Sequence, residues 1–261
     1  MRAFAALLAT CLLATQAPFP TKAWAEPPSA LDAILQRGTL RVGMTGDYRP
    51  FSARDPATGA FEGLDVDVAQ AMAAALGVKL EVVPTIWANL LPDLAAQKFD
   101  FAAGGITVTL ARQKAAFFSS PVMRSGKTPI ARCADAAKYQ TLAAIDVPGV
   151  RVITNPGGTN ELFDRANLHA ADIVVFPSNV TIFDELAAGH AEIMLTDAVE
   201  TRLQQKLHPG LCAIHPDQPF NVSELAYLLP RDVPLQQWVN AFLHIQDETG
   251  EQARMTAKWL D

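Results

Sequence analysis

The sequence lacks the motifs of several common enzyme classes. It contains no Walker A pattern, no dinucleotide-binding GxGxxG and no GxSxG nucleophile elbow. The histidines are not spaced like metal ligands; they are His169, His190, His208, His215 and His244. Nucleotide-dependent, redox, serine-hydrolase and metal-dependent chemistry therefore have no visible residues to carry them, and we expect neither a cofactor nor a metal ion.

Basic runs and long apolar segments are also scarce. The formal net charge is −6 and Lys and Arg form no cluster, whereas nucleic-acid binding needs clustered cations. The apolar run AFAALLATCLLA near the N-terminus is shorter than the ~20 residues that a membrane-spanning helix needs. We therefore expect small molecules as partners, and neither nucleic acid nor a stable membrane anchor.

Residues 1–25 have the anatomy of a cleavable signal peptide. A basic start leads into the apolar run and then to the small-x-small triplet AWA at residues 23–25. We expect cleavage after Ala25 and export of the mature chain. A lipoprotein is not expected, because Cys11 lies inside the apolar run.

Cleavage leaves only two cysteines in the mature chain, Cys133 and Cys212. Export places them in a compartment that permits disulfides, so we expect a bridge between them. Two buried free thiols are the alternative.

Segments with strand and helix patterns alternate along the mature chain. The first set is LRVGMT, GLDVDVAQAMAAALG, KLEVVPT, LLPDLAAQKFD and FAAGGIT, and the second is GVRVITN, ELFDRANL, DIVVF, NVTIFDELAAG and EIMLT. Such alternation predicts parallel sheets. With half of its residues apolar, the chain has enough for a sizeable core, and we expect an α/β protein with two lobes.

Two further apolar segments, KTPIARC and ELAYLLP, have the length and composition of strands. We expect them to pair as the two crossovers between the lobes. The first lobe would comprise residues 26–130 and 222–261, and the second would comprise residues 131–221. The C-terminal segment 234–260 is helical in pattern and would pack back on the first lobe.

Several of these segments resemble a known family, the type II periplasmic solute-binding proteins in their amino-acid-binding branch. The resemblance is carried by LRVGMTGDYRPFS, FEGLDVDVAQAMAAALG, FDFAAGGITVTLARQKAAFFSSPV, NPGGTNE and LAAGHAEIMLTD. It covers essentially the whole mature chain. It implies two α/β lobes joined by two crossover strands, a ligand site in the cleft between them, and a location in the periplasm.

A narrower set of strings resembles the cyclohexadienyl dehydratases, enzymes built on this binding-protein fold. The strings are TGDYRPFS, VPTIWANL, GKTPIARC, NPGGTNELFDRANL, NVTIF, TDAVETRLQ, LHPGLCAIHP and AYLLPRD. The resemblance implies removal of water and carbon dioxide from prephenate to give phenylpyruvate, or from arogenate to give phenylalanine. It does not decide between a monomer and a homo-oligomer.

Prephenate carries two carboxylates and a ring hydroxyl that must leave, so a site for it needs anion clamps and one acid. Arg112 can hold a carboxylate through its planar fork, and the resemblance gives it the substrate carboxylate. Lys127 stands at the start of the first crossover segment and could neutralise the second carboxylate. Composition alone favours a surface arginine, and a solvated loop lysine is an equal alternative for Lys127.

The turn NPGGTNE suits an anion, because its glycines let backbone N–H groups approach and the following helix adds its positive end. Such turns also carry glycine for conformational reasons alone. Asn155, Thr159 and Asn160 add neutral donors, and the resemblance places Asn155 and Asn160 in the pocket. Glu161 would fall in the first helical turn, where the helix dipole stabilises a carboxylate; we interpret it mainly as a helix-start residue, with a catalytic role as the lesser alternative.

The remaining candidates lie at strand ends, where open α/β sheets bind ligands. Tyr48 and Trp87 would face the cyclohexadiene ring, although either can equally be core packing. Asp47 would contact the amino group of arogenate or position a neighbour. Gly105 and Thr107, in GGITVT, lie near the expected pocket.

The segment IMLTDAVETRL presents two carboxylates three residues apart, Asp197 and Glu200. On helix-start statistics alone they read as an N-cap and its capping-box partner. The resemblance assigns Asp197 to the ligand and Glu200 to the acid that protonates the leaving hydroxyl. A carboxyl that is desolvated beside another carboxylate has a raised pKa, as a general acid requires.

An amino-acid-binding protein that serves an ABC importer is the competing function. It would use the same fold, the same arginine and the same aspartate. The combination of Glu200, Lys127 and Asn160 with the dehydratase-like strings favours the enzyme.

Overall fold

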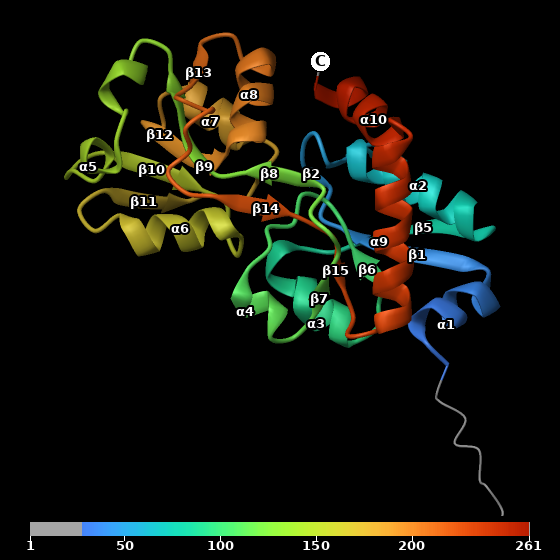
Figure 1. Cartoon of the computed structure of the whole chain (residues 1–261). Coiled ribbons are helices and arrows are strands. Elements are labelled where there is room, and N and C mark those ends of the chain that lie inside the picture. The colour runs from blue at the N-terminus through green and yellow to red at the C-terminus, as the bar shows by residue number, and fades with distance from the viewer. Residues whose placement is uncertain (1–27, 261) are drawn as a thin grey trace, which may run out of the picture.

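The computed structural model describes residues 28–260. Residues 1–27 and 261 lie outside the described residues, and with them the predicted signal peptide, its cleavage point and Cys11. The described chain folds into two lobes, each a five-stranded sheet covered by helices (Figure 1). No helix among residues 28–260 is long and apolar enough to cross a membrane.

The first sheet has the strand order β5-β1-β6-β15-β7. Strands β5 and β6 run parallel to β1, and β15 is antiparallel to β6 and β7. The strands are β1 (Thr39–Met44), β5 (Lys79–Pro84), β6 (Phe101–Ala102), β7 (Phe117–Phe118) and β15 (Leu228–Leu229). A small sheet beside it contains β2 (Asp47–Tyr48), β3 (Ser52–Arg54) and β4 (Phe61–Glu62).

Helices of the first lobe come from both ends of the chain. They are α1 (Ala30–Arg37), α2 (Leu64–Leu76), η1 (Trp87–Asn89), α3 (Leu90–Ala95), α4 (Leu110–Gln113), α9 (Val233–Glu248) and α10 (Glu251–Leu260). Helix α1 has a capping box from Ser29 and Asp32 and ends at Gly38, so its start and stop are encoded locally. The predicted C-terminal helix is two helices, because the chain turns at Gly250.

The second sheet repeats the arrangement, in the order β11-β10-β12-β9-β13. Strands β11 and β12 run parallel to β10, and β9 is antiparallel to β12 and β13. The strands are β9 (Lys127–Arg132), β10 (Arg151–Thr154), β11 (Asp172–Val175), β12 (Ile193–Asp197) and β13 (Leu211–Ala213). The helices are η2 (Ala136–Lys138), α5 (Leu142–Ile145), α6 (Thr159–Asn167), α7 (Ile182–Ala187) and α8 (Ala198–Leu207).

The predicted α/β class with two lobes is confirmed, but the sheets are mixed rather than parallel. The predicted pairing of the crossovers is wrong for KTPIARC, but ELAYLLP begins with Glu224 and Leu225 in a crossover strand. The strands that pair between the lobes are β8 (Met123–Ser125) and β14 (Ser223–Leu225), side by side in Figure 1. KTPIARC instead forms β9, which enters the second sheet beside β12.

The predicted strand FAAGGIT is shorter than expected, because only β6 joins the sheet. The glycines that follow have positive φ angles, 123° at Gly104 and 70° at Gly105, which end an extended strand. Their N–H groups donate to the buried Asp65 carboxylate at 2.8 and 2.9 Å. The chain therefore turns toward the second lobe at the carboxyl end of β6.

Cys133 and Cys212 form the expected disulfide, with their Cα atoms 4.8 Å apart. The bridge ties the residue after β9 to β13 within the second sheet.

Removing this bridge with Cys133→Ser and Cys212→Ser is expected to lower the free energy of unfolding by about 4 kcal/mol. The bridged residues are 79 apart in sequence, and release of a loop of that size raises the entropy of the unfolded chain. Urea unfolding of the oxidised parent and the double variant measures the difference. Equal unfolding midpoints at equal m values would contradict this expectation.

Candidate active site

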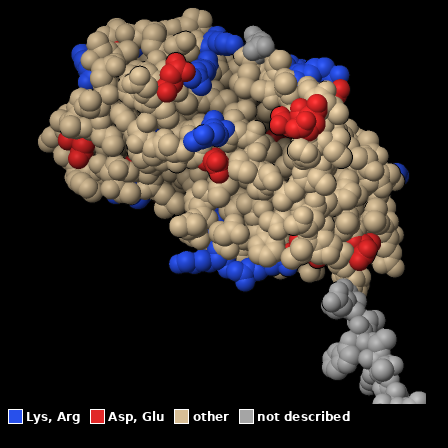
Figure 2. All heavy atoms as spheres, in the orientation of Figure 1, with Lys and Arg blue, Asp and Glu red and all other residues tan. Residues whose placement is uncertain are grey.

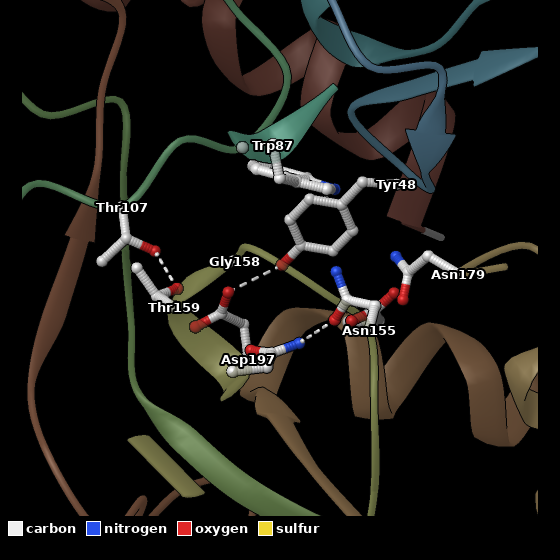
Figure 3. Close-up of a pocket in the computed structure, with 11 residues that line it drawn as sticks. Tyr48, Trp87, Thr107, Asn155, Gly158, Thr159, Asn179 and Asp197 are labelled. Carbon is white, nitrogen blue, oxygen red and sulfur yellow. Dashed lines mark hydrogen bonds between the residues drawn. The ribbon is translucent and has the colours of Figure 1, made fainter. Parts of the chain in front are cut away.

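A small cavity lies between the lobes (Figure 3). Its lining residues are Tyr48, Trp87, Gly105, Thr107, Asn155, Gly158, Thr159, Asn160, Asn179, Asp197 and Glu200. Those of the first lobe follow strands β1, β5 and β6, and those of the second follow β10 and β11, end β12, or lie at the start of α6 and α8. The cavity therefore sits where the carboxyl ends of the parallel strands of both lobes meet.

Three hydrogen bonds cross the cleft at this cavity. The Tyr48 hydroxyl donates to Asp197 Oδ2 at 2.9 Å, and the hydroxyls of Thr107 and Thr159 lie 3.1 Å apart (Figure 3). Asn179 Nδ2 donates to the carbonyl oxygen of Asp47 at 2.9 Å. The lobes are thus closed on each other, and a substrate must enter by opening the cleft.

Tyr48 and Gly105 form one wall of the cavity. Tyr48 is buried, with its ring 5.9 Å from that of Trp87. A Cβ atom added to Gly105 would lie 2.6 Å from the Tyr48 ring, and the residue has a φ of 70°. Only glycine fits here. Trp87 in turn donates from Nε1 to both carboxylate oxygens of Asp47 at 3.1 Å, and burial raises the pKa of Asp47.

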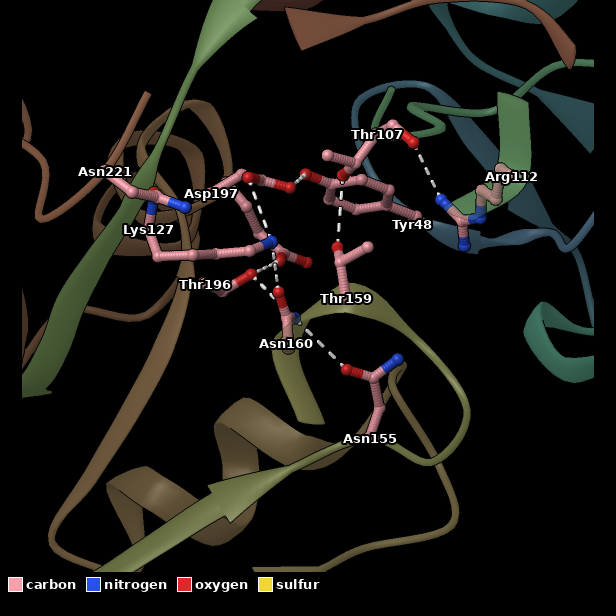
Figure 4. Close-up of polar contacts among 11 residues, drawn as sticks. Tyr48, Thr107, Arg112, Lys127, Asn155, Thr159, Asn160, Thr196, Asp197 and Asn221 are labelled. Carbon is pink, nitrogen blue, oxygen red and sulfur yellow. Dashed lines mark hydrogen bonds and ion pairs between the residues drawn. The ribbon is translucent and has the colours of Figure 1, made fainter. Parts of the chain in front are cut away.

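Lys127 and Asp197 are neighbours across two strands of the second sheet. Strand β9 begins at Lys127, whose register partner in β12 is Asp197, so both side chains lie on one face. Lys127 Nζ donates to Asp197 Oδ1 at 3.0 Å and to Asn160 Oδ1 at 2.5 Å (Figure 4). The side chains are only 2% and 4% exposed, so the ammonium balances the carboxylate away from water.

Glu200 is a buried acid on the first turn of α8, only 1% exposed. Its Oε2 accepts a hydrogen bond from the Thr196 hydroxyl at 2.5 Å. Burial, and to a smaller extent the Asp197 carboxylate, raises the pKa of Glu200 to about 8, although Thr196 and Lys127 act in the opposite direction. Glu200 therefore holds its proton near neutral pH.

The capping-box interpretation of this pair is wrong. Asp197 occupies the N-cap position of α8, but its side chain makes no capping hydrogen bond. Its oxygens instead accept from Tyr48 and Lys127. Hydrogen bonds from residues distant in sequence replace the capping bond at Asp197, so Asp197 and Glu200 do not act as a pair at the helix start.

Arg112, Lys127 and Asp47 do not line the cavity itself. Arg112 lies on α4 and donates from Nη1 to the carbonyl oxygen of Thr107 at 2.8 Å (Figure 4). It forms no ion pair with any residue from 28 to 260. Burial lowers its pKa. An arginine held beside the cavity without a carboxylate partner can accept one from a ligand.

Asn155, Asn160 and Glu161 follow β10 in the turn and first residues of α6. Asn160 is buried and donates from Nδ2 to Asn155 Oδ1 at 3.2 Å. Glu161 accepts from the N–H of Gly157 and pairs with Arg165, and the former contact chiefly lowers its pKa. Its contacts are those of a helix-start residue.

The family of the chain follows from comparison with known proteins. Residues 40–261 match the bacterial extracellular solute-binding proteins, family 3. The chain belongs to this family.

Within family 3, the chain is similar to an enzyme and to several binding proteins. It is 53% identical to the cyclohexadienyl dehydratase of Pseudomonas aeruginosa over 89% of this chain and 87% of that protein. It is 29% identical to the L-cystine-binding protein TcyJ of Escherichia coli, over 74% and 71% of the two chains. The predicted resemblance to the dehydratases is confirmed.

Similar solved structures confirm the type II fold. The crystal structure of an ancestral cyclohexadienyl dehydratase is 51% identical, with a TM-score of 0.57 over 90% of this chain and 97% of that chain. That of an ancestral amino acid-binding protein, a precursor of cyclohexadienyl dehydratase, is 35% identical, with a TM-score of 0.83 over 89% and 100%.

Two residues of the site between the lobes were not identified from the sequence. Thr196 is fully buried between Asn160 and Glu200, and Asn179 lines the cavity and bonds across the cleft. Thr196 directly precedes Asp197 at the carboxyl end of β12, a position where ligand-binding residues gather, so strand-end position could have identified it. No local pattern marks Asn179.

Surface charge adds little to this picture. On the face shown in Figure 2, most of the surface is neither basic nor acidic, and charges of both signs are dispersed over it. Among residues 28–260 no three His, Cys, Asp or Glu side chains form a metal-binding group.

Proposed function

We propose that this protein is a periplasmic cyclohexadienyl dehydratase that acts on prephenate and arogenate without a cofactor. The observation that carries the proposal is that Glu200 lines the cavity and is buried, which raises its pKa to about 8. The 53% identity to a cyclohexadienyl dehydratase supports it. A protein that only binds amino acids has no need of a neutral acid at this point.

The reaction consumes one proton and releases water and carbon dioxide. Glu200 protonates the ring hydroxyl, and the carbon–oxygen bond breaks as water leaves. The bond to the ring carboxylate breaks to release carbon dioxide, and its electron pair enters the ring and makes it aromatic. Glu200 then regains a proton from water. Exclusion of bulk water by the closed lobes keeps the acid protonated.

The charges around the cavity suit an anionic substrate. Lys127 balances Asp197, so this pair adds no net charge beside the cavity while Glu200 is neutral. An ionised Glu200 would add a negative charge and repel the substrate. Protonation of Glu200 therefore serves binding as well as proton transfer.

Two carboxylates of the substrate require two anion sites. Arg112 would hold one through its guanidinium. The start of α6, with the N–H groups of Gly158 and Thr159, would attract the other, while the Lys127 ammonium pairs with Asp197. Tyr48 and Trp87 would pack against the ring, and Asp47 lies beside Trp87 where the amino group of arogenate could reach it.

The competing function, amino-acid binding for an importer, is weakened by the partners of Asp197. A ligand ammonium needs a free carboxylate, but Asp197 already binds the Lys127 ammonium and the Tyr48 hydroxyl. Similarity to TcyJ, at 29% identity, is also lower than similarity to the dehydratase.

Incubating the purified mature protein with prephenate and following phenylpyruvate tests the proposal. A parallel incubation with arogenate follows phenylalanine and ranks the two substrates. Failure to turn over either compound, together with tight binding of a free amino acid, would establish the binding protein instead.

Replacing Arg112 with Met is expected to lower kcat/KM by roughly 30-fold or more, mainly through KM. The loss reflects a charge-assisted hydrogen bond to a carboxylate, whose removal costs about 2 kcal/mol or more. Arg231→Met is the matched control, because exposed Arg231 also donates to a backbone carbonyl, that of Lys114. Equal kcat/KM values for the two variants would contradict the role of Arg112.

A further inference from the structure

Thr196 connects Glu200 to the buried amide of Asn160. Its side chain is 0% exposed, and its Oγ1 lies 2.5 Å from Glu200 Oε2 and 3.0 Å from Asn160 Nδ2. Asn160 in turn lies 2.5 Å from Lys127 Nζ through its Oδ1 (Figure 4). Lys127, Asn160, Thr196 and Glu200 therefore form one continuous chain of hydrogen bonds.

The direction of this chain is set at Lys127. An ammonium can only donate, so the atom of Asn160 that faces it must be the carbonyl oxygen. The amide nitrogen of Asn160 then faces the other way, toward Thr196 Oγ1 and Asn155 Oδ1. Asn160 thus donates one hydrogen to Thr196.

The hydroxyl of Thr196 continues the same order of donors and acceptors. Its oxygen accepts from Asn160, and its own hydrogen needs an acceptor because the group is fully buried. Glu200 Oε2 is the sole acceptor for that hydrogen among residues 28–260. A protonated carboxyl has one carbonyl oxygen and one hydroxyl oxygen, and an oxygen that accepts from Thr196 is best the carbonyl oxygen.

We propose that Thr196 is a positioning residue that keeps the acidic proton of Glu200 on Oε1, the oxygen available to the substrate. Oε1 makes no hydrogen bond with any residue of the described part of the chain, and Glu200 lines the cavity. The Lys127 ammonium thereby orients the acid through two intervening side chains. The inference rests on the proposed function, since it assigns a purpose to the proton of Glu200.

Replacing Thr196 with Val removes the hydroxyl and keeps the shape. We expect kcat for prephenate to fall about tenfold, the cost of roughly one hydrogen bond, with KM changed less than twofold. Thr196→Ser restores the hydroxyl and should recover most of kcat. Thr201→Val is the matched control, because Thr201 is also fully buried on α8 but bonds to the carbonyl oxygen of Ala198.

Infrared difference spectra, parent minus Glu200→Gln, give a readout that does not depend on turnover. At neutral pH the parent should show a carboxylic acid carbonyl band lowered in frequency by a hydrogen bond. The band should rise in frequency in Thr196→Val and stay in place in Thr196→Ser and Thr201→Val. This pattern without turnover by the parent would support the orientation of the proton and refute the proposed function.

Three results would overturn the inference. One is a parent band at the frequency of a free carbonyl, which would place the proton on Oε2. Another is no carboxylic acid band at neutral pH, which would mean that Glu200 is ionised. The third is equal loss of kcat in Thr196→Val and Thr201→Val, which would indicate a general packing effect.

Discussion

Glu200→Gln is expected to lower kcat for prephenate dehydration by about 100- to 10,000-fold, with little change in KM. Glutamine keeps the shape and neutrality of the protonated side chain but cannot transfer an acidic proton, and general acid catalysis contributes a factor of this size. Steady-state assays of phenylpyruvate formation at saturating prephenate measure the effect. Because the substituted side chain is already neutral in the parent, binding of the anionic substrate should survive.

Glu161→Gln is the matched control for this loss of activity. Glu161 has the same side chain on the neighbouring α6, but it bonds to the Gly157 N–H and Arg165 rather than facing the cavity. We expect its kcat within twofold of the parent. Retained activity in Glu200→Gln with lost activity in Glu161→Gln would move the acid to α6.

The parent is expected to lose about 5 kcal/mol of unfolding free energy relative to Glu200→Gln between pH 4 and pH 9. The folded state raises the pKa of Glu200 from 4.5 to about 8, mainly by burial. Between these values the folded protein holds a proton that the unfolded chain has released, so stability falls as pH rises. The difference in pKa corresponds to about 5 kcal/mol at 1.36 kcal/mol per tenfold change.

The groups that face Glu200 decide the size of this effect. Asp197 and Asp47 raise its pKa, and Lys127 lowers it, while the hydroxyl of Tyr48 stays neutral because burial raises its own pKa well above the usual value. Below pH 4 both states are protonated, and Glu200→Gln should then match the parent.

Urea unfolding of both proteins at pH 4, 7 and 9 tests the expected pH dependence. The buried Asp65 and Asp164 have pKa values of about 6 and 7. Their contributions to the pH dependence of the unfolding free energy are the same in both proteins, so they cancel in the difference. Glu161→Gln should show the opposite sign, because the pKa of Glu161 is lowered in the folded state. A parent–variant difference independent of pH would show that Glu200 titrates normally.

Much of the fold could be predicted from local patterns. The capping box and Gly38 bound α1, and the helical spacing from Leu64 to Leu76 yields α2 between two glycines. The two-lobed class, the disulfide and the resemblance to the dehydratases could also be predicted. They follow from periodicity, the number of cysteines and short motifs, all of which the sequence shows directly. The crossover pairing could not be predicted, since KTPIARC and MRS are both of strand type and only the sheet decides which strand joins which partner.

The candidate residues could be predicted from the sequence, but their hydrogen-bond partners could not. Asp197 followed by Glu200 is by sequence a capped helix start. Only the tertiary structure brings Tyr48, 149 residues away, and Lys127, 70 residues away, to Asp197, and leaves Glu200 buried against Thr196. The sequence alone thus determined the elements, the family likeness and the acids at issue. The acidity of Glu200 and the orientation of its proton were decided by burial and long-range hydrogen bonds, which no local pattern encodes.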